Sequence, residues 1–153
     1  MTPRIDVLRA THSKAIQPLL ALQGYVNQNV DSHLLHLVKM RASQINGCAY
    51  CIDMHTKDAR AEGESEQRLY ALDAWRETPF YSDRERAALE WTEALTLVTE
   101  GHVPDEVFER VRRHFEEPEL VHLTLGVLAI NAWNRLCIAF RPVVGEYRPR
   151  AAA

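Results

Sequence analysis

Two cysteines and a histidine stand close together in the stretch NGCAYCIDMH, residues 46–55. If this stretch is helical, Cys48, Cys51 and His55 take positions i, i+3 and i+7, within an arc of about 60° on one face. Both sulfurs and the imidazole then point toward a common site. This combination suits thiol–disulfide chemistry, because the thiolate is the reactive form of cysteine and a neighbouring imidazole can take up and return its proton.

Two local features favour a thiolate, and they favour different cysteines. The N-terminus of a helix stabilises an anion at Cys48, whereas His55, one turn beyond Cys51, favours Cys51. We predict that Cys51 attacks and that Cys48 resolves, because a nearby base can both remove a proton and return it to a leaving group. In this cycle Cys51 attacks a peroxide O–O bond and becomes a sulfenic acid, and Cys48 condenses with it to a disulfide. An external dithiol then reduces that disulfide.

The same residues allow other interpretations. The pair could serve a thiol–disulfide oxidoreductase or a redox sensor without peroxidase turnover, or the two cysteines could simply be small buried apolar residues. A zinc-binding or structural helical module is a further alternative, with Cys48, Cys51 and His55 joined by His36 or His33 as fourth ligand. Because no second CxxC or H-x3-H pattern accompanies the first, no resident metal and no cofactor are predicted.

The elements that must position the motif are helices. Ser32 is predicted to cap a helix whose apolar residues recur at helical spacing over residues 34–45. Asn46 and Gly47 tolerate positive φ and predict a sharp turn. A central helix follows, from Cys48 to about residue 62, which places the CxxC at its N-terminus.

The rest of the chain continues the helical pattern, and the predicted fold class is all-α, a compact multi-helix domain spanning residues 1–153. Ser13 is predicted to cap the first helix. Ser82 and Glu85 form a capping box that opens a long helix ended by Gly101. Further predictions are a short helix at residues 65–73, helices whose first turns hold Pro104 and Pro118, and an extended tail, residues 142–153, lying on a partner subunit.

Composition and charge exclude several classes of protein. A net charge of −3 over 153 residues does not fit a nucleic-acid-binding protein. The apolar stretch at residues 120–140 carries His122 and Arg135, so we expect a buried helix, in its own core or against another subunit, and no membrane span. Its Cys137 is predicted to be an inert buried thiol, and Asn131, Trp133, Asn134 and Arg135 to serve packing and capping. The first residues lack a signal-peptide pattern, so a cytoplasmic location is expected.

The core RASQINGCAYCIDMHTKDAR, residues 41–60, resembles the signature of the alkylhydroperoxidase D-like (AhpD-like) branch of the carboxymuconolactone decarboxylase superfamily. The resemblance continues through residues 75–98 and through INAWNR at residues 130–135. It implies an all-α fold assembled as a homo-oligomer, a dimer, trimer or hexamer. It also implies a thiol-dependent peroxidase of antioxidant defence that reduces hydroperoxides and is recycled by a thioredoxin-like or lipoyl-bearing dithiol protein.

The resemblance also implies roles for single residues. The second cysteine of the motif is the peroxidatic one in this branch, which agrees with Cys51. Twelve residues before the first cysteine the branch carries a glutamate that orients the histidine and relays protons, and here that position holds His36. A neutral imidazole can accept a proton, so we predict a relay through His36 and His55, with weaker activation because the negative charge is missing. The decarboxylases of the superfamily do not depend on the cysteine pair, whose presence argues against that activity here.

Overall fold

A computed structural model describes residues 2–6 and 13–149 of the chain. Within these residues it is all helical, with no strand, as predicted. The elements are α1 (Ser13–Asn29), α2 (Ser32–Asn46), α3 (Ala49–Ala61), α4 (Glu66–Ala71), the 3-10 helix η1 (Leu72–Glu77), α5 (Asp83–Thr96), the 3-10 helix η2 (Val98–Glu100), α6 (Asp105–Val111) and α7 (Glu117–Phe140).

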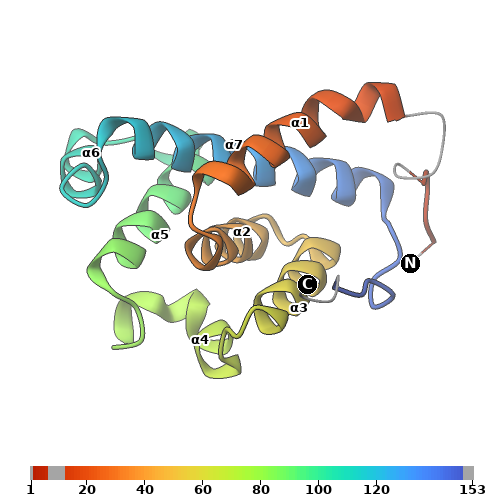
Figure 1. The fold of residues 1–153 in the computed structure, drawn as a ribbon, viewed down its shortest axis with the longest axis horizontal. Coiled ribbons are helices and arrows are strands. Elements are labelled where there is room, and N and C mark those ends of the chain that lie inside the picture. Colours follow the sequence, from red (N-terminus) through yellow and green to blue (C-terminus); the bar gives the residue numbers. More distant parts are fainter. Residues whose placement is uncertain (1, 7–12, 150–153) are drawn as a thin grey trace.

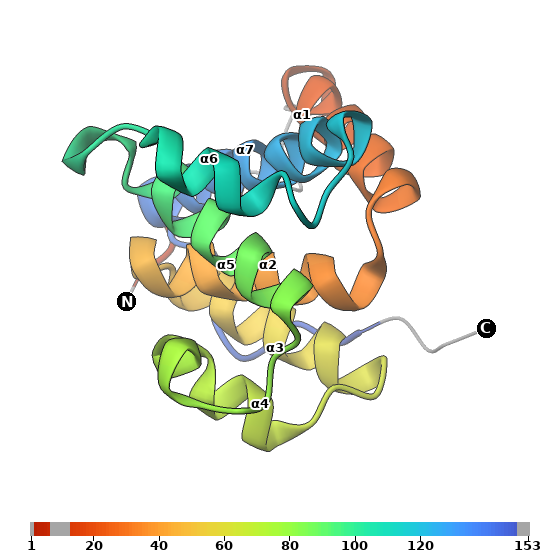
Figure 2. The ribbon, with the colours of Figure 1, turned by 90° about the vertical axis from the view of Figure 1, so that its left-hand side faces the viewer.

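Helix α2 lies at the centre of the molecule, and the others surround it. It packs against α3, α5 and α7, while α1 lies along α7 on the far side of the molecule from α4 (Figures 1 and 2). Nine of the 15 residues of α2 are buried, so it presents apolar side chains in several directions rather than along one stripe. The site residues named in the sequence analysis lie on α2, α3 and α7, and these three helices meet around the C-terminal half of α2.

The buried apolar residues form three clusters. One joins α2 to α5, α6 and α7 around Val38, Trp91 and Val127. A second joins α2, α3, η1 and α5 around Leu37, Leu72 and Leu89. The third and smallest contains the two cysteines of the motif, with Ala42 and Ile130, and packs against Tyr50, Trp133 and Cys137. The cysteine pair is therefore part of the core between α2, α3 and α7.

Helix caps confirm some predicted boundaries and correct others. The capping box of Ser82 and Glu85 is present at the start of α5. Helix α2 is capped by Asp31 and not by Ser32, because the Asp31 carboxylate accepts a hydrogen bond from the Leu34 amide and its charge suits a helix N-terminus. Cys48 is the N-cap of α3 rather than its first helical residue. The cap predicted at Ser13 falls on a side chain outside the described residues.

Other helix boundaries differ from the predicted ones by about one helical turn. The helix expected over residues 65–73 is α4 followed directly by η1, which extends to Glu77. The long helix of residues 83–100 leaves the α-helical conformation after Thr96 and ends as the 3-10 turn η2, before Gly101. Pro118 lies in the first turn of α7 as predicted, whereas Pro104 is the N-cap of α6.

The tail has no helix or strand up to residue 149, as predicted, but it lies on its own chain. Lys57 of α3 donates to the carbonyl oxygens of Gly145 and Tyr147, at 3.2 Å each, and the Gly145 amide donates to Asp53 at 3.1 Å. These contacts attach the tail to α3 of its own chain, and a contact of the tail with a partner subunit stays a prediction. The N-terminal segment is held similarly, with the Arg4 amide donating to the carbonyl of Phe140.

Helix α7 is long and apolar enough to cross a membrane by length and composition alone, which is weak evidence for such a role. Only 33% of its most apolar window is buried within the chain. It packs against α1, α2, α3 and α5, and its Asn134 is fully buried. Its outer face leaves Val121, Leu128 and Ile138 about half exposed.

Candidate active site

A tight turn sets the position of the first cysteine. Gly47, with φ of 66°, ends α2 in the left-handed conformation that glycine adopts without strain, and Cys48 follows as the N-cap of α3. The Asn46 side chain ties this turn to α7 by donating to Asn131 at 3.0 Å and to Asn134 at 2.9 Å. The two asparagines of α7 therefore hold the end of α2 in place, in keeping with the packing role predicted for them.

The two sulfurs of the motif are in direct contact. Cys48 Sγ and Cys51 Sγ lie 2.8 Å apart, and each residue is 1% exposed. Cys137 joins them from α7, so that all three sulfurs lie within 4.8 Å of one another. All three cysteines are free thiols. The structure thus brings together the predicted pair and a third sulfur that the sequence interpretation had set aside as inert.

Hydrogen bonds distribute the charge unevenly over this group of sulfurs. Hydrogen bonds with Cys137 and Cys51, opposed by burial, lower the pKa of Cys48 to about 3. Hydrogen bonds of Cys51 with Cys137 and Cys48, together with burial, raise the pKa of Cys51. The bond to Cys48 raises the pKa of Cys137 to about 12. These shifts, together with the N-terminus of α3, favour the anion on Cys48 and the protons on Cys51 and Cys137.

His55 lies one turn further along α3 and is only 6% exposed. Its Nδ1 is 3.6 Å from the Asp58 carboxylate, too far for a hydrogen bond, and Asp58 accepts a bond of 2.7 Å from the hydroxyl of Tyr147 in the tail. Burial lowers the pKa of His55, with Asp58 opposing and Lys39 adding to the decrease. The imidazole is therefore held neutral near pH 7 and can accept a proton.

His36 occupies a different environment from the one predicted. It is buried on α2, and its Nε2 lies 3.1 Å from the Glu62 carboxylate at the end of α3. Among the described residues no hydrogen bond joins it to His55. The acidic group beside His55 is Asp58 instead. A relay through His36 stays a prediction.

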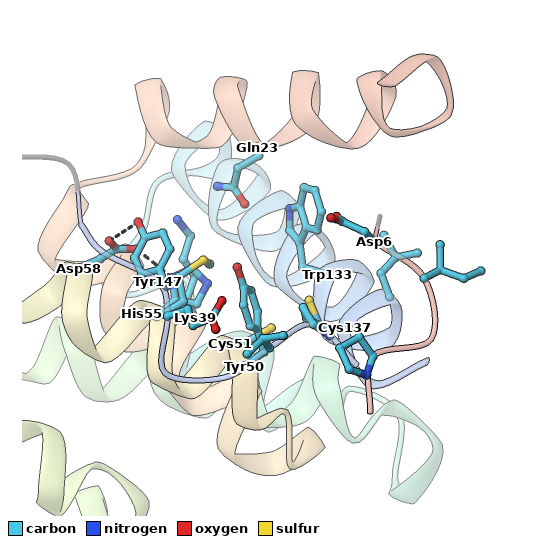
Figure 3. A pocket seen from close by; sticks show the side chains of 17 residues that line it. Asp6, Gln23, Lys39, Tyr50, Cys51, His55, Asp58, Trp133, Cys137 and Tyr147 are labelled. Carbon is cyan, nitrogen blue, oxygen red and sulfur yellow. Dashed lines mark hydrogen bonds and ion pairs between the residues drawn. The ribbon is translucent and has the colours of Figure 1, made fainter. Parts of the chain in front are cut away.

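A cavity of about 640 Å³ opens beside the site (Figure 3). At one end lie Lys39, His55, Asp58 and Tyr147, and toward the other lie Tyr50, Cys51 and Cys137. Most of the remaining wall is apolar and comes from the N-terminal segment, α3, α7 and the tail: Pro3, Ile5, Met54, Trp133, Leu136, Pro142 and Val143. Cys51 faces this space, whereas Cys48 and His36 are not among its lining residues. Of the two cysteines of the motif, Cys51 is therefore the one that a substrate in the cavity can contact.

Lys39 adds a buried positive charge to this wall. It is 8% exposed, and desolvation lowers its pKa to about 8, with Asp58 and Glu62 opposing. Sequence reasoning missed Lys39, Asp58, Tyr147 and the site role of Cys137. The spacing of Asp58 three residues after His55 places it on the same helical face, which is a usable signal. No local pattern connects Tyr147 or Cys137 to the motif.

The zinc alternative finds little support in the donor geometry. Among the described residues the grouping suited to a metal consists of the three cysteines, without His55 or His36. Two sulfurs bound to one tetrahedral zinc stand about 3.8 Å apart, since each Zn–S bond is about 2.3 Å. The 2.8 Å contact of Cys48 and Cys51 is much shorter and suits a shared proton or a disulfide in formation.

Comparison with known proteins agrees with this geometry. The profile of the carboxymuconolactone decarboxylase family matches residues 13–94. The uncharacterized protein YdfG of Bacillus subtilis is 49% identical over 122 residues, which cover 79% of this chain and 83% of YdfG.

Solved structures extend the likeness to nearly the whole chain. A crystal structure from Agrobacterium tumefaciens, described as a protein of unknown function and a candidate AhpD antioxidant defence protein, superposes with a TM-score of 0.87 at 41% identity, covering 97% of this chain and 99% of that one. A peroxidase-related protein from Silicibacter shares the fold, with a TM-score of 0.79 at 20% identity over 95% of this chain and 78% of that one. The chain therefore belongs to the carboxymuconolactone decarboxylase family, and within it to the AhpD-like branch.

Proposed function

We propose that this protein is a thiol-dependent peroxidase that reduces hydroperoxides through Cys51 and Cys48, with His55 as acid and base, in antioxidant defence. The observation that supports this most directly is the 2.8 Å contact between two free thiols, one of which faces a largely apolar cavity. Two sulfurs this close form a disulfide after only a small movement, since the S–S bond is about 2.05 Å long.

The first step is oxidation of Cys51. The proton of Cys51 passes along the sulfur contact to Cys48, which leaves the anion on the sulfur that faces the cavity. Cys51 attacks the terminal oxygen of the hydroperoxide, so that an S–O bond forms as the O–O bond breaks. The electron pair leaves on the alkoxide, which becomes the alcohol by taking the Cys48 proton through His55. Cys51 is now a sulfenic acid and Cys48 a thiolate.

The second step closes the disulfide. The Cys48 thiolate attacks the sulfur of the Cys51 sulfenic acid, the S–S bond forms, and the S–O bond breaks with loss of hydroxide, which takes a proton from solvent. The low pKa of Cys48 favours this step, because it keeps the resolving sulfur deprotonated. An external dithiol, borne by a thioredoxin-like or lipoyl protein, then reduces the disulfide. This cycle requires a reducing compartment, and we place the protein in the cytoplasm.

We also propose that the protein works as a homo-oligomer, a dimer, trimer or hexamer. The outer face of α7 exposes Val121 and Leu128 by about half, and Leu20 of α1 is 43% exposed. A second copy of the chain is the proposed occupant, because the family resemblance implies self-assembly. Light scattering coupled to gel filtration tests this, and a monomer at micromolar concentration would contradict it.

A second candidate function uses the same pair. A sensor needs only slow oxidation, and the burial of Cys48 and Cys51, each 1% exposed, is compatible with slow oxidation. The two functions differ in turnover. With dithiothreitol as reductant, a peroxidase consumes many equivalents of cumene hydroperoxide per chain, whereas a sensor consumes about one.

The decisive experiment is a thiol titration after one equivalent of peroxide. The peroxidase proposal requires rapid loss of two thiols per chain and their recovery with dithiol, and Cys51→Ser must lose no thiol. Ala49→Ser, an exposed change between the same cysteines, serves as the control and should behave as the unmodified protein. Folded, metal-free protein that keeps all its thiols would exclude the proposed function.

A further inference from the structure

Cys137 is the third sulfur of the site, and the proposed catalytic cycle leaves it without a role. It projects from the last turns of α7, and its sulfur lies within 4.8 Å of those of Cys48 and Cys51. Unlike these two it is only partly buried, and it lines the cavity beside Cys51 (Figure 3). Cys48 does not line the cavity. A disulfide of Cys48 and Cys51 would thus have one sulfur at the cavity wall and one behind it.

The distances keep Cys137 within reach when the pair is oxidised. Closing the 2.8 Å contact to a bond of about 2.05 Å moves the sulfurs by less than about 1 Å. Cys137 then remains next to both disulfide sulfurs and needs only side-chain rotation to meet one of them. Thiol–disulfide exchange depends on such access and on how well the displaced sulfur leaves.

We propose that Cys137 is a third redox thiol, which exchanges into the Cys48–Cys51 disulfide to give a Cys51–Cys137 disulfide at the cavity wall. The Cys137 sulfur attacks the Cys51 sulfur, the Cys48–Cys51 bond breaks, and its electron pair goes to Cys48. The Cys137 proton passes to Cys48 or to solvent, so that one disulfide replaces another without net oxidation. Cys48 is the better leaving sulfur, because the N-terminus of α3 and the Asn134 side chain still stabilise its thiolate when Cys51 and Cys137 are joined in a disulfide.

The exchange places the oxidised bond where a reductant can attack it. An external thiolate attacks the Cys137 sulfur, the Cys51–Cys137 bond breaks, and Cys51 is released as the thiolate needed for the next peroxide. The second thiol of the reductant then displaces the mixed disulfide at Cys137. This part of the inference rests on the proposed peroxidase function, whereas the exchange itself does not.

The exchange is tested with diamide, which oxidises thiols to disulfides without peroxide. The folded protein is oxidised, quenched in acid, alkylated and mapped as peptides by mass spectrometry. We expect peptides joined through Cys51 and Cys137 beside those joined through Cys48 and Cys51, in the unmodified protein and in the control Ala139→Ser, an exposed change on the same helix. Oxidised, folded protein that contains only the Cys48–Cys51 pairing overturns the inference.

Variants add a peroxide-driven test. In Cys48→Ser the first oxidation should be slower, because Cys48 no longer takes the Cys51 proton, but Cys137 replaces the missing resolving thiol. Given time for complete reaction, one equivalent of peroxide should therefore consume two thiols and leave little sulfenic acid for dimedone. In the double variant Cys48→Ser with Cys137→Ser, dimedone should label Cys51 nearly fully. Equal labelling of the two variants contradicts a redox role for Cys137. If diamide yields the Cys51–Cys137 pairing but peroxide consumes no thiols in any variant, the exchange stands and the peroxidase proposal fails.

A rate measurement separates this role from a structural one. Reduction of the oxidised protein by dithiothreitol should be about tenfold slower in Cys137→Ser, because the reductant must then attack a less accessible sulfur. Circular dichroism and the urea midpoint show whether that variant remains folded. An unchanged reduction rate in a folded variant contradicts reduction by attack on the Cys137 sulfur.

Discussion

The two ends of helix α3 differ in how the polar groups around them are paired. At the N-terminal end three sulfurs with one negative charge lie among apolar residues, and the charge is stabilised by S–H donors and the helix terminus. At the C-terminal end buried nitrogen-bearing side chains lie near carboxylates, His36 beside the more exposed Glu62 and Lys39 near Asp58. The first arrangement concentrates charge on a nucleophile, and the second neutralises it. We therefore expect changes at the first end to affect reactivity and changes at the second to affect stability and pH response.

The largest effect should follow from Cys51→Ser. We expect the rate of hydroperoxide reduction to fall by about 10³-fold or more, because serine at neutral pH offers almost no anion for the attack. A peroxidase assay with cumene hydroperoxide measures this. Residual activity within tenfold of the unmodified protein would mean that the N-terminal end of α3 does not hold the attacking sulfur.

His55 lies between the two ends, and His55→Gln should have the next largest effect. We expect a decrease of about 10²-fold in rate near pH 7, since glutamine cannot carry the Cys48 proton to the leaving oxygen. The disulfide should still form slowly. The matched control is His114→Gln, which lies outside the site, and its rate should match that of the unmodified protein.

Substitutions of His36 and Glu62 test the C-terminal end of α3. His36→Glu restores the acidic residue of the family pattern but sets two carboxylates about 3 Å apart, because Glu62 faces this position. We expect a loss of about 1–2 kcal/mol in the free energy of unfolding, measured in urea. The swapped variant, His36→Glu with Glu62→His, should recover most of that loss.

The swapped variant also tests the relay predicted for His36. If His36 passes protons to His55, the swap should keep or raise the peroxidase rate, since a carboxylate is the group that the family uses there. A collapse of the rate in the folded, swapped variant would assign His36 some other role.

Tyr147→Phe should have a smaller effect. It removes the hydrogen bond of 2.7 Å to Asp58 and with it one attachment of the tail, at a cost of about 1 kcal/mol in stability. Tyr70→Phe is the matched control, because Tyr70 also donates to a carboxylate, that of Glu66, but is 76% exposed. Urea denaturation of both variants measures the difference, and equal losses would contradict a structural role for the tail contact.

The pH dependence of stability should show the smallest effect. Burial lowers the pKa of His55 below its ordinary value of 6.5, so below that pH the unfolded chain binds more protons than the folded one. Stability contributed by His55 is therefore present above about pH 6.5 and is lost as the pH falls toward the folded pKa. Between pH 6.5 and 5 the unfolding free energy should fall more steeply than in His55→Gln. Parallel curves would contradict a buried neutral His55.

Much of the site was predictable because it depends on local geometry. Cys51 and His55 lie on α3 at a spacing that brings both to one cavity, and Gly47 marks the turn that places Cys48 at the N-cap. The choice between the two cysteines was harder. The helix N-terminus favours a thiolate at Cys48, whereas His55 favours one at Cys51. In the structure the negative charge is favoured on Cys48, and Cys51 is the one of the two that lines the cavity.

The sequence by itself determined that the chain is helical, where the cysteine motif lies on its helix, and which family it resembles, because spacing, capping residues and turn residues act over a few positions. Only the tertiary structure decided that Cys137 joins the pair, that Tyr147 reaches Asp58 and that an apolar cavity faces Cys51. These contacts join α3 to residues some 80–90 positions away. They arise from the packing of α3 against α7 and the tail, which no local pattern of residues specifies.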